Sequence, residues 1–123
     1  MKGKTILVVD DDRMLAEMYR ERFKLEGFNI ETVANGHEGI KVAKRTAPDL
    51  ILLDIMMPGT DGWQMLHQLK KDPATKAIPV IVDTALMQDA IKQKAKRMGA
   101  DELLVKSETT PAKMIAMMNQ CLH

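Results

Sequence analysis

Residues 6–12 read ILVVDDD, an apolar run rich in β-branched residues that stops at three successive aspartates. A run without polar alternation is typical of a parallel strand that is covered on both faces of its sheet. Residues 50–54 (LILLD) and 80–84 (VIVDT) have the same form, because each is an apolar run that reaches an aspartate. The sequence therefore predicts three buried strands whose carboxyl ends carry acidic side chains.

Strands and helices are expected to alternate along the rest of the chain. Strands are predicted over residues 6–9, 29–34, 50–53, 80–82 and 103–105, and the second of these is polar enough to lie at an edge. Helices are predicted over about 13–26, 36–47, 62–72, 88–98 and from 111 onward. Asp12 is placed to cap the first helix, and Gly27 to end it. This order predicts a doubly wound α/β fold, a three-layer sandwich with a five-stranded parallel sheet between helices.

Length and composition set the broad class. The chain has 123 residues, 46% apolar and 28% charged, and we expect one domain over residues 1–123. No signal peptide follows Met1, and no apolar run approaches the roughly 20 residues that span a bilayer. We therefore expect a cytoplasmic protein without a membrane contact. The net charge of +1 does not favour binding to nucleic acid.

Polar side chains follow the predicted strands at the edge where their carboxyl ends meet. This edge is the ligand-binding edge of an open parallel sheet. Asp10 and Asp11 follow the first strand, Asp54 the third, Thr84 the fourth and Lys106 the fifth. Neighbouring carboxylates repel one another unless cations offset their charge, and Lys106 supplies only one positive charge. We expect Mg²⁺, a hard cation that prefers oxygen ligands, to supply the rest.

These residues make the chain resemble the receiver domains of two-component response regulators. The resemblance rests on residues 6–12, residues 52–62 (LLDIMMPGTDG), Thr84-Ala85 and Lys106, in the family's order and strand context. It covers essentially the whole chain and implies a stand-alone receiver of the single-domain type. It also implies a flavodoxin-like, CheY-like fold with strand order 2-1-3-4-5.

The resemblance implies a role for each site residue. Asp54 would be the phosphoacceptor, and Thr84 and Lys106 would bind oxygens of the phosphoryl group. The ligands of Mg²⁺ would be Asp10, Asp11, Asp54 and the backbone carbonyl of Met56. The chain would be a signalling module in a His-Asp phosphorelay and not an enzyme, although it would assist its own phosphorylation and dephosphorylation.

The resemblance also implies partners. A sensor histidine kinase or a histidine phosphotransfer protein would donate the phosphoryl group. A downstream protein would bind the face made by helix 88–98, strand 103–105 and the last helix. Methionines near this face would also offer a soft contact surface for a second copy of the chain, as a homodimer. Helix 88–98 is basic and has only a narrow apolar stripe, so we expect it to be weakly anchored.

Two residues depart from the family's pattern near Lys106. Ser107 stands where the family usually has proline after a cis peptide bond. A non-prolyl cis bond costs about 2.5 to 4 kcal/mol, so we predict a trans Lys106-Ser107 bond and a reshaped loop. Leu103 stands where the family has an aromatic switch residue, which puts the family's threonine-to-aromatic coupling in doubt.

Three further residues set expectations for the chemistry. Met56 and Leu86 occupy positions that govern water access to the phosphoryl group in this family. Both are apolar and cannot orient a hydrolytic water, which predicts a long-lived aspartyl phosphate. Asp83 replaces an expected apolar strand residue, and it is either an acid at a frayed strand end or a buried carboxylate with a hydrogen-bonding or lysine partner.

Two alternative functions are weighed against phosphorylation. A receiver-like interaction module that works without phosphorylation is favoured by Ser107 and Leu103, but the complete acceptor set argues against it. A flavodoxin would share the architecture but would need a phosphate loop rich in hydroxyls and glycine after the first strand. Residues 10–12 (DDD) would repel a phosphate there unless metal is bound.

Overall fold

The three apolar runs form the centre of a five-stranded parallel sheet in the computed structural model, which describes residues 3–57, 60–85 and 88–122. The strands of this sheet are β1 (Thr5–Val9), β2 (Asn29–Val33), β3 (Leu50–Asp54), β6 (Val80–Thr84) and β7 (Glu102–Val105). Their spatial order is β2-β1-β3-β6-β7, with every neighbouring pair parallel. The predicted order, second-first-third-fourth-fifth, is confirmed.

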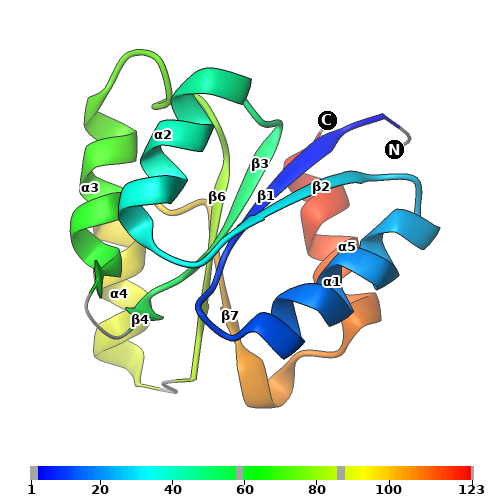
Figure 1. Cartoon of the computed structure of the whole chain (residues 1–123). Coiled ribbons are helices and arrows are strands. Elements are labelled where there is room, and N and C mark those ends of the chain that lie inside the picture. The colour runs from blue at the N-terminus through cyan, green and yellow to red at the C-terminus, as the bar shows by residue number, and fades with distance from the viewer. Residues whose placement is uncertain (1–2, 58–59, 86–87, 123) are drawn as a thin grey trace.

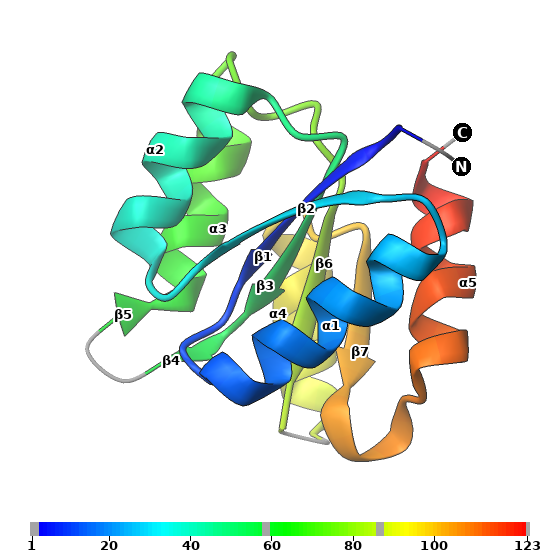
Figure 2. The same cartoon turned by 45° about the vertical axis from the view of Figure 1, so that its right-hand side comes forward.

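Helices cover both faces of the sheet. They are α1 (Arg13–Leu25), α2 (Gly36–Thr46), α3 (Gly62–Lys71), α4 (Asp89–Arg97) and α5 (Pro111–Cys121). Figures 1 and 2 show α1 and α5 on one face and α2, α3 and α4 on the other. No helix in the described ranges is long and apolar enough to cross a bilayer.

The helix starts and stops follow from local sequence, and the predicted roles of Asp12 and Gly27 are confirmed. Asp12, Asn35 and Thr110 each accept a hydrogen bond from a backbone N–H in the first turn of the helix that follows. Gly27 and Gly99 adopt φ values of +92° and +95° just after α1 and α4, a backbone conformation that favours glycine.

Alternate residues of the central strands fill two separate cores. On the α2–α3–α4 side, Leu7, Ile51 and Val80 pack with helix residues such as Leu66. On the α1–α5 side, Ile6, Leu52 and Ile81 pack with residues such as Phe23 and Met118. Burial on both faces explains why these strands lack polar alternation.

Helix α4 is weakly anchored, and two short strands lie outside the main sheet. Ala95 is the only buried residue of α4, which agrees with the predicted weak anchoring of this helix. The short strands β4 (Met56–Met57) and β5 (Thr60–Asp61) pair antiparallel between β3 and α3, where a loop was expected. Strands of two residues are too short to produce an alternating pattern that sequence reasoning can detect.

Candidate functional site

The parallel register of the sheet gathers the predicted polar residues at one edge. Asp54 ends β3 and lies beside Asp83 of β6, while Thr84 ends β6 beside Val105 of β7. Asp10 directly follows β1, and Lys106 directly follows β7. The carboxyl ends of four strands therefore bring together side chains that are far apart in the sequence.

Lys106 stands between two buried carboxylates. Its Nζ lies 3.2 Å from Asp10 Oδ2 and 3.2 Å from Asp54 Oδ2, so it pairs with both. Asp10 and Asp54 are each only 4% exposed, whereas the Lys106 side chain is 24% exposed. Lys106 therefore bridges two carboxylates that are largely shielded from water.

Backbone groups hold the second oxygen of each carboxylate. The Asp12 N–H donates to Asp10 Oδ1 at 2.9 Å, and the Met56 N–H donates to Asp54 Oδ1 at 3.0 Å. Each buried carboxylate thus has a cationic partner on one oxygen and an amide partner on the other. This pairing fixes the orientation of both groups.

The site remains short of positive charge despite Lys106. Burial raises the pKa of the Asp10 carboxyl, and the nearby charge of Asp54 adds to the rise, although Asp12 N–H and Lys106 oppose it. Burial lowers the pKa of Lys106, but attraction to Asp10 and Asp54 outweighs it, so the pKa is raised overall. One lysine therefore does not fully offset the carboxylates around it.

The donor set at this edge fits a hard divalent cation. One carboxylate oxygen from each of Asp10, Asp11 and Asp54 lies within 4.8 Å of the others. Asp10 and Asp54 are buried and Asp11 is exposed, which leaves an open side through which an ion and its water ligands can enter. Carboxylate oxygens held this close are the ligands that Mg²⁺ prefers.

The structure places all but one of the remaining predicted residues. Thr84 is fully buried at the end of β6, and the Met56 side chain is half exposed in β4. Leu86, expected to limit water access, lies outside the described residues. Every peptide bond in the described ranges is trans, so the predicted trans Lys106-Ser107 bond is confirmed, and a 3₁₀ turn, η1 (Lys106–Glu108), follows β7. Leu103 is half-buried and packs against the α2–α3–α4 core.

A buried tyrosine–aspartate pair adjoins the site. Asp83 is only 1% exposed, and the Tyr19 hydroxyl donates a hydrogen bond to its Oδ2 at 3.2 Å. The other oxygen, Oδ1, has no hydrogen-bond partner among the residues that the structure describes. Burial raises the pKa of Asp83 to about 7. Burial also raises the pKa of Tyr19, and the charge of Asp83 raises it further.

Sequence reasoning identified Asp83 as unusual and missed Tyr19. The buried alternative for Asp83 is confirmed, with a phenol as its hydrogen-bond partner and Lys106 as a nearby charge. The sequence does place Tyr19 on the apolar face of α1, together with Ala16 and Phe23. This placement does not show that Tyr19 bonds to Asp83, because that contact depends on how α1 packs on the sheet.

Comparison with known sequences shows which proteins the chain is similar to. Residues 6–119 match the family model of the response regulator receiver domain. Protein PilH of Pseudomonas aeruginosa is 43% identical over 103 residues, which make up 82% of this chain and 84% of PilH. The phosphate regulon transcriptional regulatory protein PhoB of the same organism is 35% identical over all 123 residues. The chain spans about half of PhoB, 53% of its length.

Solved structures give the same result. The chemotaxis protein CheY4 of Vibrio cholerae superposes with a TM-score of 0.90 at 26% identity, covering 97% of this chain and 98% of that one. The Francisella response regulator 1452 receiver domain gives a TM-score of 0.90 at 28% identity, covering 98% and 97%. Sequence, fold and the acidic edge of the sheet agree, and the chain belongs to the response regulator receiver domains of two-component signalling.

Proposed function

We propose that Asp54 accepts a phosphoryl group from a phosphohistidine and that the resulting aspartyl phosphate changes the binding of partner proteins. The observation that carries this proposal is the environment of one carboxylate. Asp54 is buried, lies 3.2 Å from the Lys106 ammonium, and shares a cluster of carboxylate oxygens with Asp10 and Asp11. A carboxylate can attack a phosphoryl group only where the charge of that group is offset, and this edge is arranged to do so.

The transfer step is a substitution at phosphorus. A carboxylate oxygen of Asp54 forms a bond to phosphorus as the bond between phosphorus and the imidazole nitrogen breaks. The electron pair of that bond leaves with the nitrogen, which yields an acyl phosphate and a free histidine. Lys106 pairs with one phosphoryl oxygen and the Thr84 hydroxyl donates to another, which stabilises the charge that develops there.

Asp10, Asp11 and Asp54 would hold Mg²⁺ at this site, together with the backbone carbonyl of Met56. Bound Mg²⁺ supplies positive charge beside the phosphoryl oxygens during transfer. The Met56 N–H keeps Asp54 Oδ1 in place, and Lys106 keeps Oδ2 in place. The nucleophile is therefore oriented before the donor arrives.

The phosphodonor would be a sensor histidine kinase or a histidine phosphotransfer protein in the cytoplasm. The family membership and the exposed approach beside Asp11 support such a donor. A downstream protein or a second copy of the chain would bind the α4–β7–α5 face. The weak anchoring of α4 supports that choice, since a helix with one buried residue can shift at low cost.

We expect the phosphoryl group to be long-lived. The half-exposed Met56 side chain is apolar and cannot hold an attacking water by hydrogen bonding. Phosphorylated protein, freed of donor and kept in Mg²⁺, should retain its label for minutes or longer. Loss of the label within seconds would contradict this part of the proposal.

Acetyl phosphate provides the direct test of acceptor function. The intact protein is incubated with acetyl phosphate and Mg²⁺, and a phosphoryl adduct is sought by mass spectrometry. We expect an adduct that is absent in Asp54→Asn and absent when EDTA replaces Mg²⁺. If neither small donors nor a histidine kinase produces an adduct, the interaction module without phosphorylation becomes the better account.

A further inference from the structure

A pocket lies between α2 and α3, at the end of the molecule opposite the acidic site. Its cavity of about 350 Å³ is bounded by the middle and last turns of α2, by the last turn of α3 and by the turn that follows α3. Figure 1 shows these helix ends far from the carboxyl ends of β1 and β3. The pocket is therefore separate from the phosphoacceptor site, and nothing in the proposed phosphorylation step uses it.

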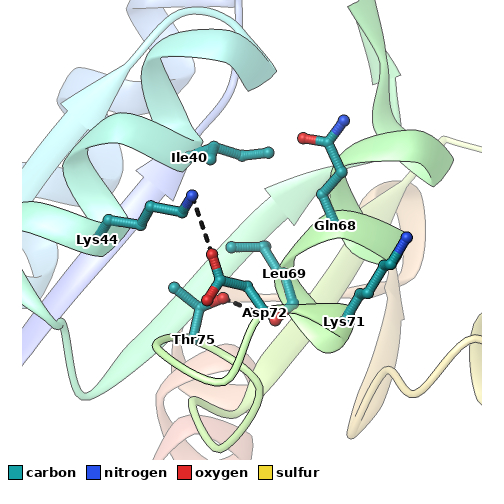
Figure 3. A pocket seen from close by; sticks show the side chains of 7 residues that line it. All are labelled: Ile40, Lys44, Gln68, Leu69, Lys71, Asp72 and Thr75. Carbon is teal, nitrogen blue, oxygen red and sulfur yellow. Dashed lines mark hydrogen bonds and ion pairs between the residues drawn. The ribbon is translucent and has the colours of Figure 1, made fainter.

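The floor of the pocket is apolar and its rim is basic. Ile40 of α2 is half-buried and Leu69 of α3 is buried, and both line the cavity. Lys44 and Lys71 line it from α2 and α3 respectively, and both are exposed. Figure 3 shows Lys44 on one side of the opening and Lys71 on the other, with Leu69 between them. A buried apolar floor beneath exposed cations suits a side chain that is apolar and flanked by negative charge.

Asp72, an acidic residue that lines the pocket, already pairs with a lysine. Asp72 Oδ2 lies 2.9 Å from the Lys44 Nζ, as Figure 3 shows. The Ala74 N–H lowers the pKa of Asp72, and Lys44 lowers it further, which favours the charged carboxylate that pairs with Lys44. Thr75 is also satisfied, since its hydroxyl donates to the Leu69 carbonyl at 2.7 Å. These contacts leave the pocket a positive charge that Asp72 does not cancel.

The positive charge that remains at and beside the pocket comes from lysines that have no partner in the described part of the chain. Within the described residues, no ion pair or hydrogen bond engages the side chain of Lys71. Lys41 is likewise exposed and unpaired within those ranges, and it lies one turn before Lys44 on α2. Lysines at helix C-termini stabilise the helix dipole, but that role does not require an apolar cavity between them.

We propose that the α2–α3 pocket docks an acidic peptide segment of a partner protein, which inserts one bulky apolar side chain between Ile40 and Leu69. Carboxylates beside that side chain would pair with Lys71 at the rim of the cavity and with Lys41, which lies one turn from Lys44 on α2 and outside the cavity lining. The charge complementarity selects an acidic partner, and the modest cavity volume selects one anchoring side chain. Because the pocket is remote from Asp54, this docking is independent of phosphorylation and acts as a constitutive tether.

A synthetic peptide tests the proposal on the whole chain. The probe is a short peptide with one phenylalanine flanked by glutamates, titrated while amide NMR spectra of the protein are recorded. We expect signals of α2, α3 and the turn after α3 to shift. Peptides with alanine in place of phenylalanine, or with lysines in place of the glutamates, should not shift them.

Reversing one charge at the pocket and one on α4 shows whether peptide binding depends on the pocket. Lys71→Glu should weaken peptide binding about fivefold or more, whereas Lys92→Glu on α4 should leave it unchanged. Asp54→Asn should bind the peptide like the unaltered chain, and Lys71→Glu should still be phosphorylated by acetyl phosphate. Peptide shifts that map to α4, sensitivity to Lys92→Glu, or no binding at millimolar peptide would overturn the proposal.

Discussion

The ammonium group of Lys106 is the main positive charge within a largely buried acidic cluster. It lies 3.2 Å from both Asp10 and Asp54, and attraction to them raises its pKa despite burial. Any phosphoryl group placed on Asp54 would add further negative charge beside the same lysine. The residue therefore matters both to the resting site and to transfer.

Replacing Lys106 should impair acceptor chemistry more than folding. Lys106→Met keeps the length of the side chain and removes its charge, and we expect the rate of phosphorylation by acetyl phosphate to fall at least about tenfold. The rate is measured from the growth of the phosphoryl adduct at fixed Mg²⁺. Lys113→Met, on the exposed side of α5, serves as the control and should react at the unaltered rate. An unchanged rate in Lys106→Met would contradict the role given to this lysine.

Asp83 should make stability fall as the pH rises. Burial raises its pKa from the ordinary aspartate value of 3.8 to about 7 in the folded protein, so the folded state binds its proton more tightly than the unfolded state. The contribution of Asp83 to the free energy of unfolding is fully present below about pH 4, and it is lost as the pH rises through about 7. Asp83→Asn keeps an acceptor for Tyr19 and cannot ionise.

The difference in unfolding free energy between Asp83→Asn and the unaltered chain should therefore grow with pH. It should be smallest near pH 4 and reach at most about 4 kcal/mol in favour of the variant above pH 7, at 1.36 kcal/mol for each pKa unit. Urea unfolding in metal-free buffer at several pH values measures it. A difference that stays constant across this range would show that Asp83 ionises in the folded state as it does in the unfolded one.

Among the elements, α4 is the least firmly packed helix of the sandwich. It buries only Ala95, whereas α3 buries four residues, including Met65 and Leu66. We expect the backbone amides of α4 to exchange with solvent deuterium about tenfold faster than those of α3, because local opening exposes little apolar surface. Hydrogen-exchange mass spectrometry on the unphosphorylated protein measures both helices at once. Equal protection of α3 and α4 would contradict the weak anchoring.

Elements that depend on neighbouring residues could be predicted from the sequence, whereas those that depend on tertiary packing could not. The run at residues 6–12 predicted β1 and the cap of α1, because apolar continuity and an aspartate at the N-cap are properties of neighbouring residues. The β4–β5 pair was missed because its pairing follows from the path of the chain between β3 and α3. Asp83 was recognised as unusual, but its partner Tyr19 lies 64 positions away and is set by tertiary packing.

At the scale of the whole molecule, the net charge of +1 hides an uneven distribution of charge between two ends. The acidic site occupies the carboxyl ends of the strands, whereas Lys44 and Lys71 lie in the last turns of α2 and α3 at the opposite end. The residues of the site were predictable because a parallel sheet brings its strand ends together. The α2–α3 pocket was not predictable, since it depends on the spacing between two packed helices.

Mg²⁺ should stabilise the folded chain as a whole. A ligand that binds only the folded state at about ten times its dissociation constant adds about 1.4 kcal/mol, which for a domain of this size raises the Tm by about 5 °C. Thermal unfolding with Mg²⁺ and with EDTA measures this difference. Asp11→Asn removes the exposed member of the carboxylate cluster and should abolish most of the shift. An equal shift in this variant would place the Mg²⁺ elsewhere.

The identity of the phosphorylated residue is the central claim, and borohydride reduction tests it most directly. The protein is phosphorylated with acetyl phosphate and Mg²⁺, reduced with borohydride and digested, and its peptides are sequenced by mass spectrometry. Reduction converts an aspartyl phosphate into homoserine, which marks the modified position permanently. The account predicts homoserine at position 54 and unmodified aspartate at positions 10, 11 and 83. Homoserine at any of those other positions, with Asp54 unmodified, would contradict it.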